Sequence, residues 1–285
     1  MSKIEWTDIT RNPVKGKCPN ACPYCYAIEI YDNNKWDPSI RFRPEVLDDL
    51  PRKPCRVFVG STMELLLFPE WLPAIFDRCR QHPEHTFIFL TKLPRELPKW
   101  SPFPENCEVG VTVTDREAAH QAFFYIPLFR AKVKFLSLEP LLDDVTQYLY
   151  FWNLVRAVDG IIIGGMTGRK GKLMQLQKEH FPQMRLEKLD AVGRKWTLLP
   201  RLEWVKRIIE EADAAGIPVF LKDNLYKLAM ERPVEDHDLY WEDMSTLRQE
   251  LPRRSCGDQG VTTLKAVVTS SSDHPKARVT SGGGD

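Results

Sequence analysis

Three cysteines close to the N-terminus are the residues of this sequence with the clearest chemistry. Cys18, Cys22 and Cys25 follow the spacing C-x3-C-x2-C, with an aromatic residue directly before the last one. Three thiolates on one short loop can bind three irons of a [4Fe-4S] cluster, which usually takes four cysteine ligands. The fourth iron would then be open to another ligand, as the metal of a catalytic site must be. The spacing therefore predicts an iron–sulfur centre with an open iron.

Two other interpretations of the cysteine loop stay open. A structural zinc site needs a fourth ligand, and the nearest histidines, His82 and His85, are far along the chain. Three inert, buried cysteines would be unusual within eight residues that also include two prolines. Because the chain has seven cysteines, an odd number, a disulfide framework is a weaker interpretation than metal binding.

Composition sets limits on the class of protein. The formal net charge of +1 gives no general case for nucleic acid or an acidic surface as partner. The N-terminus has no apolar run of the signal-peptide type, and no stretch approaches the length of a transmembrane helix. We therefore expect a cytoplasmic protein with no membrane association. The sequence is silent on its oligomeric state.

Short apolar runs that alternate with helical patterns indicate the elements that must position the cysteine loop. Six runs rich in Val, Ile and Phe predict strands at Arg56–Gly60, Thr86–Leu90, Glu108–Val113, Lys134–Leu138, Gly160–Gly164 and Ile217–Leu221. Helical patterns lie between several of them, at Pro69–His82, Arg116–Phe124 and Leu202–Ala215. Strands that barely alternate are typical of parallel sheets with both faces buried. The pattern therefore predicts an α/β fold with mostly parallel strands.

Polar residues or glycines directly follow five of the six predicted strands. They are Gly60-Ser61, Thr91-Lys92, Thr114-Asp115, Glu139-Pro140 and Gly164-Gly165. Parallel strands bring their carboxyl ends to one edge of the sheet, where α/β proteins build their sites. We therefore expect these residues to line one pocket.

Three side chains near these strand ends are our candidates for catalytic roles. Glu139 is the strongest, because a glutamate in so apolar a run is costly to bury without a purpose. Ser137 lies two residues earlier on the same face of the strand, so both side chains point into the site or both point away. Glu64 could bind a substrate or cap a nearby helix. Lys92 could contact an anionic group, and exposure to solvent is the common alternative.

The segment Thr167–Pro200 interrupts the regular pattern as a long insertion or lid. It carries eight Lys or Arg against three acidic residues. With Trp196 and Phe181 it could bind a phosphate backbone and stack a base, although such runs are more often a solvated face. We expect one partial barrel at 1–252 that includes this insertion, and a disordered tail at 253–285, where Ser, Thr, Gly and charged residues dominate.

Further motifs extend the cysteine loop into a family resemblance. They are Ile4-Glu5-Trp6-Thr7-Asp8, Asn12-Pro13-Val14, Tyr26-Ala27, Val57-Phe58-Val59-Gly60-Ser61, His85-Thr86-Phe87, Leu90-Thr91-Lys92, Phe135-Leu136-Ser137-Leu138-Glu139-Pro140-Leu141-Leu142, Ile163-Gly164-Gly165 and Ile217–Lys222. With them, the chain resembles the phage gene product thirty-seven / sixty-eight family. That family is a domain of unknown function with a motif like that of radical S-adenosylmethionine (SAM) enzymes.

The resemblance implies a partial (β/α) barrel of the radical SAM type, with the cysteine loop after a first strand near Lys3–Asp8. It implies a [4Fe-4S] cluster on the three cysteines, S-adenosyl-L-methionine as second cofactor, and an electron donor such as a flavodoxin or ferredoxin. Such enzymes cleave SAM reductively, and the resulting 5′-deoxyadenosyl radical abstracts hydrogen from a substrate. The resemblance does not supply that substrate, for which a nucleobase or nucleic acid is one candidate.

The resemblance and the strand ends together give the expected cofactor contacts. They are Tyr24, Gly60, Ser61, Thr91, Ser137, Glu139, Gly164 and Gly165. The chain departs from the family pattern at Arg11, Leu93, Thr114 and Met166, which we expect to face the site, so its substrate need not be that of the family majority. The competing hypothesis is a non-catalytic module, stapled by a metal, that binds nucleic acid or a protein.

Overall fold

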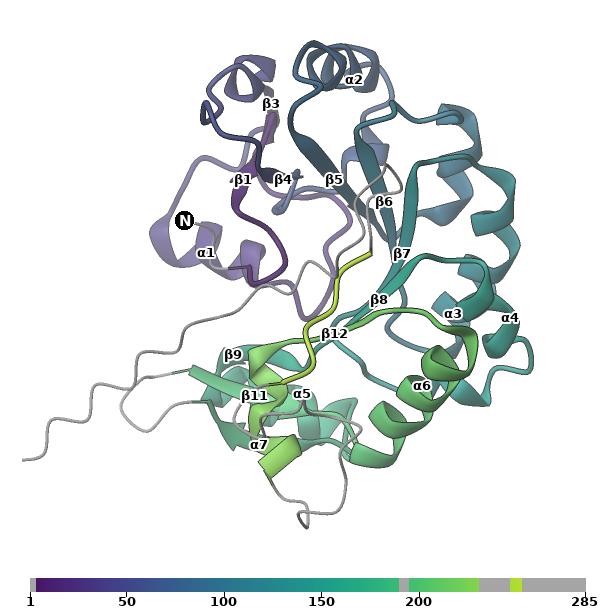
Figure 1. Cartoon of the computed structure of the whole chain (residues 1–285). Coiled ribbons are helices and arrows are strands. Elements are labelled where there is room, and N and C mark those ends of the chain that lie inside the picture. Colours follow the sequence, from purple (N-terminus) through teal and green to yellow (C-terminus); the bar gives the residue numbers. More distant parts are fainter. Residues whose placement is uncertain (1–3, 190–194, 231–246, 253–285) are drawn as a thin grey trace, which may run out of the picture.

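A curled sheet of seven parallel strands forms the centre of the protein (Figure 1). The computed structural model describes residues 4–189, 195–230 and 247–252. In spatial order, the strands are β1 (Ile9–Arg11), β4 (Arg56–Val59), β5 (Thr86–Thr91), β6 (Cys107–Thr112), β7 (Val133–Leu138), β8 (Gly160–Ile163) and β12 (Val219–Leu221). Every neighbouring pair is parallel. The predicted α/β partial barrel with mostly parallel strands is confirmed, and all six predicted strands belong to it.

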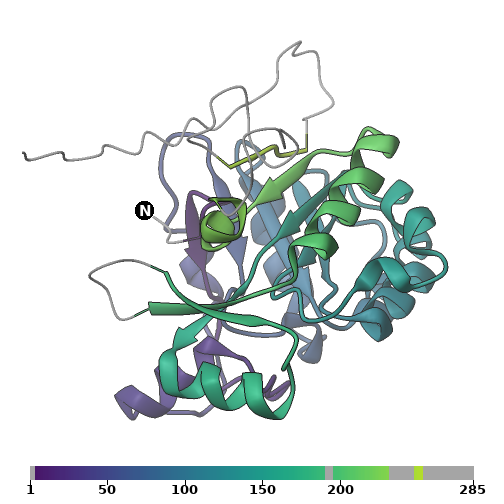
Figure 2. The same cartoon turned by 90° about the horizontal axis from the view of Figure 1, so that it is seen from below.

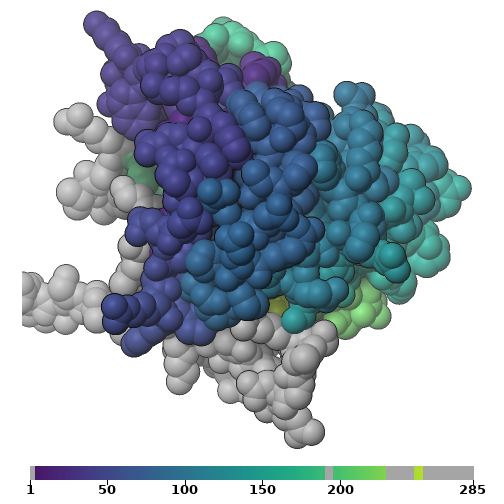
Figure 3. All heavy atoms as spheres, turned by 90° about the horizontal axis from the view of Figure 1, so that it is seen from above, coloured from purple at the N-terminus to yellow at the C-terminus, as the bar shows by residue number. Residues whose placement is uncertain are grey.

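Helices cover the convex, outer face of this sheet (Figure 1). They are α2 (Leu72–Gln81), α3 (Arg116–Tyr125), α4 (Phe151–Arg156) and α6 (Leu202–Ala215). Helix α6 begins and ends at the residues that the sequence predicted. Seen in space filling, the colours run in sequence order across the molecule, so consecutive strand–helix units lie side by side (Figure 3). This is the arrangement expected of repeated βαβ units.

Shorter elements connect these units. They are β2 (Val14–Lys15), α1 (Tyr26–Asn34), β3 (Arg41–Phe42), α7 (Tyr226–Met230) and the 3-10 turns η1 (Pro44–Leu47), η2 (Leu65–Leu67), η3 (Pro94–Trp100), η4 (Ile126–Leu128), η5 (Val145–Gln147) and η6 (Asp223–Leu225).

The first strand lies later in the chain than predicted. It is Ile9–Arg11 and not Lys3–Asp8, because the chain turns before it: the Thr7 amide donates to the Ile4 carbonyl oxygen at 3.2 Å. Pairing with β4 begins where Ile9 lies opposite Val57. The Trp6 side chain is instead buried against the concave face of the sheet, 4.8 Å from Phe58 between ring centroids.

Alternate residues of each strand face opposite sides of the sheet. Residues such as Leu136, Leu138 and Ile161 belong to the large core under the helices. Their neighbours form a smaller apolar cluster on the concave face, which we call the inner plug: Trp6, Phe58, Ile88, Phe135, Ile162 and Phe220. The alternation is hard to see in the sequence because both faces are apolar along the middle of the strands.

The insertion after β8 folds into a small layer of its own. Strands β9 (Met166–Arg169), β10 (Arg185–Lys188) and β11 (Lys195–Leu199) form an antiparallel sheet in the order β10-β11-β9, with α5 (Lys170–Glu179) against it. Helix α5 lies beside α1 (Figure 2), and the Lys172 ammonium is 2.8 Å from a Glu29 carboxylate oxygen. The insertion therefore contacts the helix that follows the cysteines.

Two further expectations concern the ends and the surface of the chain. The predicted disordered tail, 253–285, lies outside the described residues. Within the described ranges, no helix has the length and apolar character needed to span a membrane.

Candidate functional site

The cysteine loop follows β1 and β2 and ends at the first residue before α1. Two tight turns shape it: the Ala21 amide donates to the Cys18 carbonyl oxygen at 3.3 Å, and the Cys25 amide to that of Cys22 at 3.0 Å. Cys25 then forms the N-terminal cap of α1. All three cysteines are free thiols of intermediate exposure, whereas Ala21 on the outer side of the loop is exposed. The loop thus presents its thiols from consecutive turns.

Backbone and side-chain N–H groups point at two of these sulfurs. The Glu64 amide donates to Cys18 Sγ and the Asn20 side-chain amide to Cys22 Sγ, each at 3.3 Å. Such donors stabilise a thiolate. Burial raises the pKa of the Cys22 thiol, the charge of Lys92 opposes the rise, and Cys25 adds to it. Lys92 therefore lies close enough to the loop to favour its ionised form.

The sulfurs of the loop are less close to one another than the ligands of one tetrahedral metal would be. A tetrahedral zinc with bonds of about 2.3 Å holds its thiolates about 3.8 Å apart. Among the described residues, only His82, Glu84 and His85 form a group of three potential ligands within 4.8 Å of one another. The three loop sulfurs do not form such a group. A [4Fe-4S] cluster binds each thiolate through a different iron and so does not require them to lie as close together.

The His82, Glu84 and His85 group is itself unsuited to a metal. The Cys55 amide donates to His85 Nδ1 at 3.2 Å, so in the neutral ring Nε2 carries the proton. That nitrogen lies 3.4 Å from a Glu84 carboxylate oxygen. The group is a hydrogen-bonded cluster at the amino end of β5, away from the cysteine loop.

At the carboxyl ends of the strands, the concave face changes from apolar to charged. Lys222, directly after β12, forms an ion pair with Glu139, directly after β7. Its ammonium is also 3.6 Å from a Glu5 carboxylate oxygen. Burial raises the pKa of Glu5, and Lys222 opposes this rise. The Lys222 ammonium thus forms ion pairs with two half-buried carboxylates.

Tyr26 connects this charged group with the cysteine loop. About half of the residue is exposed (48%), but its hydroxyl donates to the Ser61 carbonyl oxygen at 3.1 Å. Burial of the hydroxyl raises the pKa of Tyr26, and Cys25 and Glu139 raise it further. The charges of the third cysteine and of the β7 carboxylate therefore both act on the Tyr26 hydroxyl.

Glu64 is buried and fully hydrogen-bonded. Its carboxylate accepts from the Thr91 hydroxyl at 2.7 Å and from the Lys92 amide at 2.8 Å, while its own amide reaches Cys18. Burial raises the pKa of Glu64, and these hydrogen bonds oppose the rise. The Thr91 hydroxyl also accepts from the Leu93 amide at 2.9 Å. Glu64 and Thr91 thus join the cysteine loop to the end of β5.

Packing accounts for the glycine at the end of β4. Gly60 has φ of +78°, and a Cβ there would lie 2.6 Å from Leu65. Next to it, the Ser61 hydroxyl donates to the Asn12 side-chain oxygen at 3.2 Å. Ser61 also contacts the helix that follows the cysteine loop, because its carbonyl oxygen accepts from the Tyr26 hydroxyl.

The paired glycines after β8 are in contact with two different parts of the molecule. A Cβ on Gly164 would lie 3.0 Å from Lys222 and 3.3 Å from Glu139, so this glycine makes room for the ion pair. A Cβ on Gly165 would lie 2.8 Å from the Leu198 carbonyl oxygen of the insertion. The Asn224 side chain binds both the amide and the carbonyl of Gly165, at 3.0 and 2.9 Å.

Two buried hydroxyls on the concave face have no hydrogen-bond partner: those of Ser137 on β7 and Thr112 on β6. The two residues lie opposite each other in the sheet register. Ser137 was predicted as a site residue from its spacing to Glu139, and it does share the concave face with the inner plug.

Tyr24 and the insertion aromatics are engaged with the protein itself. Tyr24 packs against the core of the insertion, together with Phe181 and Trp196. The Lys170 ammonium lies 4.5 Å from the Trp196 ring centroid. Met166, which we expected to face the site, is instead buried in this core (3% exposed), because β9 turns its side chain toward α5 and β11.

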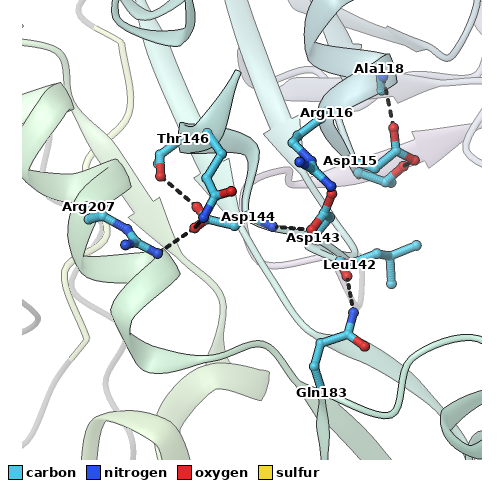
Figure 4. A network of polar contacts seen from close by, with 11 residues as sticks. Asp115, Arg116, Ala118, Leu142, Asp143, Asp144, Thr146, Gln183 and Arg207 are labelled. Carbon is cyan, nitrogen blue, oxygen red and sulfur yellow. Dashed lines mark hydrogen bonds and ion pairs between the residues drawn. The ribbon is translucent and has the colours of Figure 1, made fainter. Parts of the chain in front are cut away.

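A polar network fixes the loops that follow β6 and β7 (Figure 4). Asp115 caps α3 by accepting from the Ala118 amide at 2.8 Å, and Arg116 pairs with Asp143 at 2.8 Å. Asp144, buried, accepts from Thr146 at 2.6 Å and from Arg207 of α6 at 2.5 Å. These contacts hold the carboxyl ends of the two strands in place.

Sequence reasoning did not find Glu5, Thr112 or Asn224. Glu5 stood in a quoted motif, but its pairing with Lys222 depends on the curl of the sheet. Thr112 lies inside a predicted strand, and its face becomes known only from the register. Asn224 follows the last strand by three residues, a position that sequence alone does not connect to Gly165.

Comparisons with known proteins give one family and one group of structures. No curated protein matches. Spore photoproduct lyase complexed with dinucleoside spore photoproduct is similar over 73% of this chain and 75% of that one, with 11% identity and a TM-score of 0.46. A mutant of the same lyase, with bound AdoMet and dinucleoside spore photoproduct, is similar over 73% of this chain and 74% of that one, with 11% identity and a TM-score of 0.46.

The family model that matches covers residues 1–181 and is described as a protein of unknown function. It agrees with the expected domain of unknown function, and its description does not mention a phage gene product. The match includes the cysteine loop and the first six strands of the spatial order. The chain therefore belongs to the DUF5131 family.

Proposed function

We propose that the protein is a radical SAM enzyme in which Cys18, Cys22 and Cys25 hold a [4Fe-4S] cluster. The observation that supports this most is the position of Tyr26. Its hydroxyl donates to the Ser61 carbonyl oxygen just after β4, and the charges of Cys25, Glu139 and Lys222 all act on its pKa. We infer that the thiols face the charged end of the concave face, where a second cofactor and a substrate would have to lie.

The bound cluster and SAM would supply a 5′-deoxyadenosyl radical that abstracts hydrogen from an unidentified substrate. The residues of this chain would bind and orient the cofactors and the substrate. Lys92, whose ammonium forms no ion pair with the described residues, would contact an anionic group and favour the Cys22 thiolate. Glu139 and Glu5 share one lysine, so the group retains a negative charge that suits a cationic ligand.

The remaining expected residues divide into three groups. Glu139, Ser137 and Gly164 lie on the concave face and would contact the ligands. Glu64 and Thr91 would position the loop through their hydrogen bonds, and Gly60, Ser61, Tyr24 and Gly165 would shape the surrounding backbone.

Partners follow from the same arrangement. An electron donor such as a flavodoxin or ferredoxin would approach the loop from its outer side, where Ala21 and Pro23 are exposed. A nucleobase or nucleic acid is one candidate substrate, with the basic insertion as an additional contact. We place the enzyme in the cytoplasm.

Iron and sulfide analysis of protein purified without air tests the proposal. We expect about four irons per chain, and formation of 5′-deoxyadenosine from SAM after reduction with dithionite. Cys22→Ser should fold and lose the iron, since Cys22 is only partly buried. Cys55→Ser, a partly buried cysteine outside the loop, is the matched control and should keep the iron. Zinc in place of iron, or a full cluster that yields no 5′-deoxyadenosine, would contradict the proposal.

A further inference from the structure

An exposed apolar surface lies on α3, α4 and the turns beside them, on the side away from the sheet. Among the described residues, five of the eleven large apolar side chains that are exposed lie between positions 124 and 152. We call these five side chains, which are 46% to 74% exposed, the α3–α4 surface: Phe124, Leu128, Leu149, Tyr150 and Trp152. Single exposed apolar side chains need no explanation, whereas a group on neighbouring helices does.

Ring contacts make this surface continuous. The Phe123 ring, near the end of α3, stacks on the Tyr150 ring, at the start of α4, with 5.1 Å between the centroids. Phe124 packs edge-on against Phe123 at 5.5 Å. The Arg156 guanidinium, one turn further along α4, lies 5.2 Å from the centroid of the Trp152 ring. The two helices therefore present one surface and not two separate groups.

The area of the α3–α4 surface suits a protein interface. An aromatic side chain has an area on the order of 150–250 Å², so three half-exposed rings and two exposed leucines present roughly 500 Å². A stable interface removes about 800 Å² from each partner and has an apolar centre within a polar rim. The surface is therefore large enough to form the apolar centre of one such interface.

The border of this surface at the carboxyl ends of the strands is acidic. A shallow depression of about 550 Å³ opens there, lined by Asp115, Arg116, Glu117, His120, Asp143 and Tyr148. The His120 ring contacts the Phe124 ring at 4.8 Å and so joins the depression to the α3–α4 surface. Arg116 is paired with Asp143 (Figure 4), which leaves the charges of Asp115 and Glu117 in excess.

The opposite border, at the amino ends of the strands, is basic. Where α3 and α4 lead into β7 and β8, the exposed charged residues are three cations and one carboxylate: Arg130, Lys132, Arg156 and Asp159. Both helices run antiparallel to the strands, so each begins at the acidic border and ends at the basic one. The α3–α4 surface thus lies between borders of opposite charge.

We propose that the α3–α4 surface is the interface of a two-fold symmetric dimer of this chain. A two-fold axis perpendicular to the surface turns the second copy end to end. The apolar centres then meet, and the acidic border of each copy faces the basic border of the other. A partner of one charge would match only one border, whereas a second copy matches both. Because the surface lies on the outer side of the sheet, the concave face of each copy stays open, and the inference does not depend on the proposed cluster chemistry.

Sedimentation equilibrium of the full chain, purified without air, tests the proposal. Wild type should sediment at twice the mass of one chain at micromolar concentrations. Leu149→Glu places a charge at the most exposed apolar position of the interface and should raise the dimer dissociation constant by about tenfold or more. Met174→Glu, which changes an exposed apolar side chain on α5, is the matched control and should dimerise like wild type. Circular dichroism checks that both variants fold.

A charge exchange tests the end-to-end arrangement. Glu117→Lys and Lys132→Glu each bring like charges together at both borders, so each should weaken the dimer by about tenfold at low salt. The double variant exchanges the two charges between the borders and should restore the wild-type affinity, since opposite charges face each other again.

Several results would overturn the proposal. A monomer at every concentration would assign the surface to some other partner, and an assembly larger than two would exclude a closed two-fold interface. A dimer that Leu149→Glu leaves intact would use another part of the molecule. A double variant as weak as the single ones would show that the borders do not face each other.

Discussion

The two faces of the same sheet have different compositions, although they are built from alternate residues of the same strands. The outer face is apolar along most of the strands and packs against helices. The inner face is apolar only at the inner plug and then changes to hydroxyls, glycines and charges. The comparison teaches that one strand can belong to the scaffold and to the site at once, because alternate residues of the strand face the helices and the concave face.

Two adjacent residues of β7 give the largest expected contrast. Leu136 is fully buried on the outer face, so Leu136→Ala should lower the free energy of unfolding by about 2–5 kcal/mol. Ser137→Ala, one residue further along the strand and equally buried, should leave the free energy of unfolding unchanged. Urea unfolding followed by circular dichroism measures both. A cost below about 1 kcal/mol for Leu136→Ala would show that the two faces do not differ in this way.

Glu64 connects the cysteine loop to the sheet, and its removal should have the next largest effect. In Glu64→Gln the amide nitrogen must face a backbone N–H donor, either that of Leu66 or that of Lys92. We expect a loss of about 1–3 kcal/mol in unfolding free energy. Glu105→Gln, an exposed glutamate, is the control and should stay within about 0.5 kcal/mol of wild type. Equal values for the two variants would mean that the buried carboxylate does not hold the loop.

The pH dependence of Glu5 should give the smallest effect. Its pKa is raised above 4.5 in the folded protein, mainly by burial, so the folded state retains this proton more readily than the unfolded chain. The contribution is fully present below pH 4.5 and is lost as the pH rises through the raised value. Wild type should therefore lose stability relative to Glu5→Gln between pH 4.5 and pH 7. Parallel melting-temperature curves for the two proteins would count against a buried Glu5.

The sequence predicted the six strands beyond the first because each is a short apolar run bounded by a turn. It also predicted that the strand ends would carry the polar residues, because a parallel sheet gathers them at one edge. The first strand, which the family resemblance implied near Lys3–Asp8, was placed too early, since the chain turns at Thr7 and the Trp6 side chain belongs to the inner plug and not to the sheet. The fold of the insertion was missed, because its strands are polar and pair antiparallel.

The site was harder to predict than the fold. The cysteines are recognisable from spacing, whereas Asn224 and Glu5 act through partners that the curl of the sheet brings close. The glycines illustrate the same limit. Gly165 looked like an opening for a ligand, and it is in fact where the insertion and Asn224 come together.

The contact between Glu5 and Lys222 has a consequence for the order in which the protein is made. Glu5 precedes β1 and Lys222 follows β12, the two edge strands of the sheet. During synthesis the cysteines leave the ribosome first, and the lysine that neutralises their neighbouring carboxylates leaves it long afterwards. A nascent chain therefore carries the three thiols of the cysteine loop well before it has the residues that face them. Loading of the proposed cluster would have to wait until the last strand is in place.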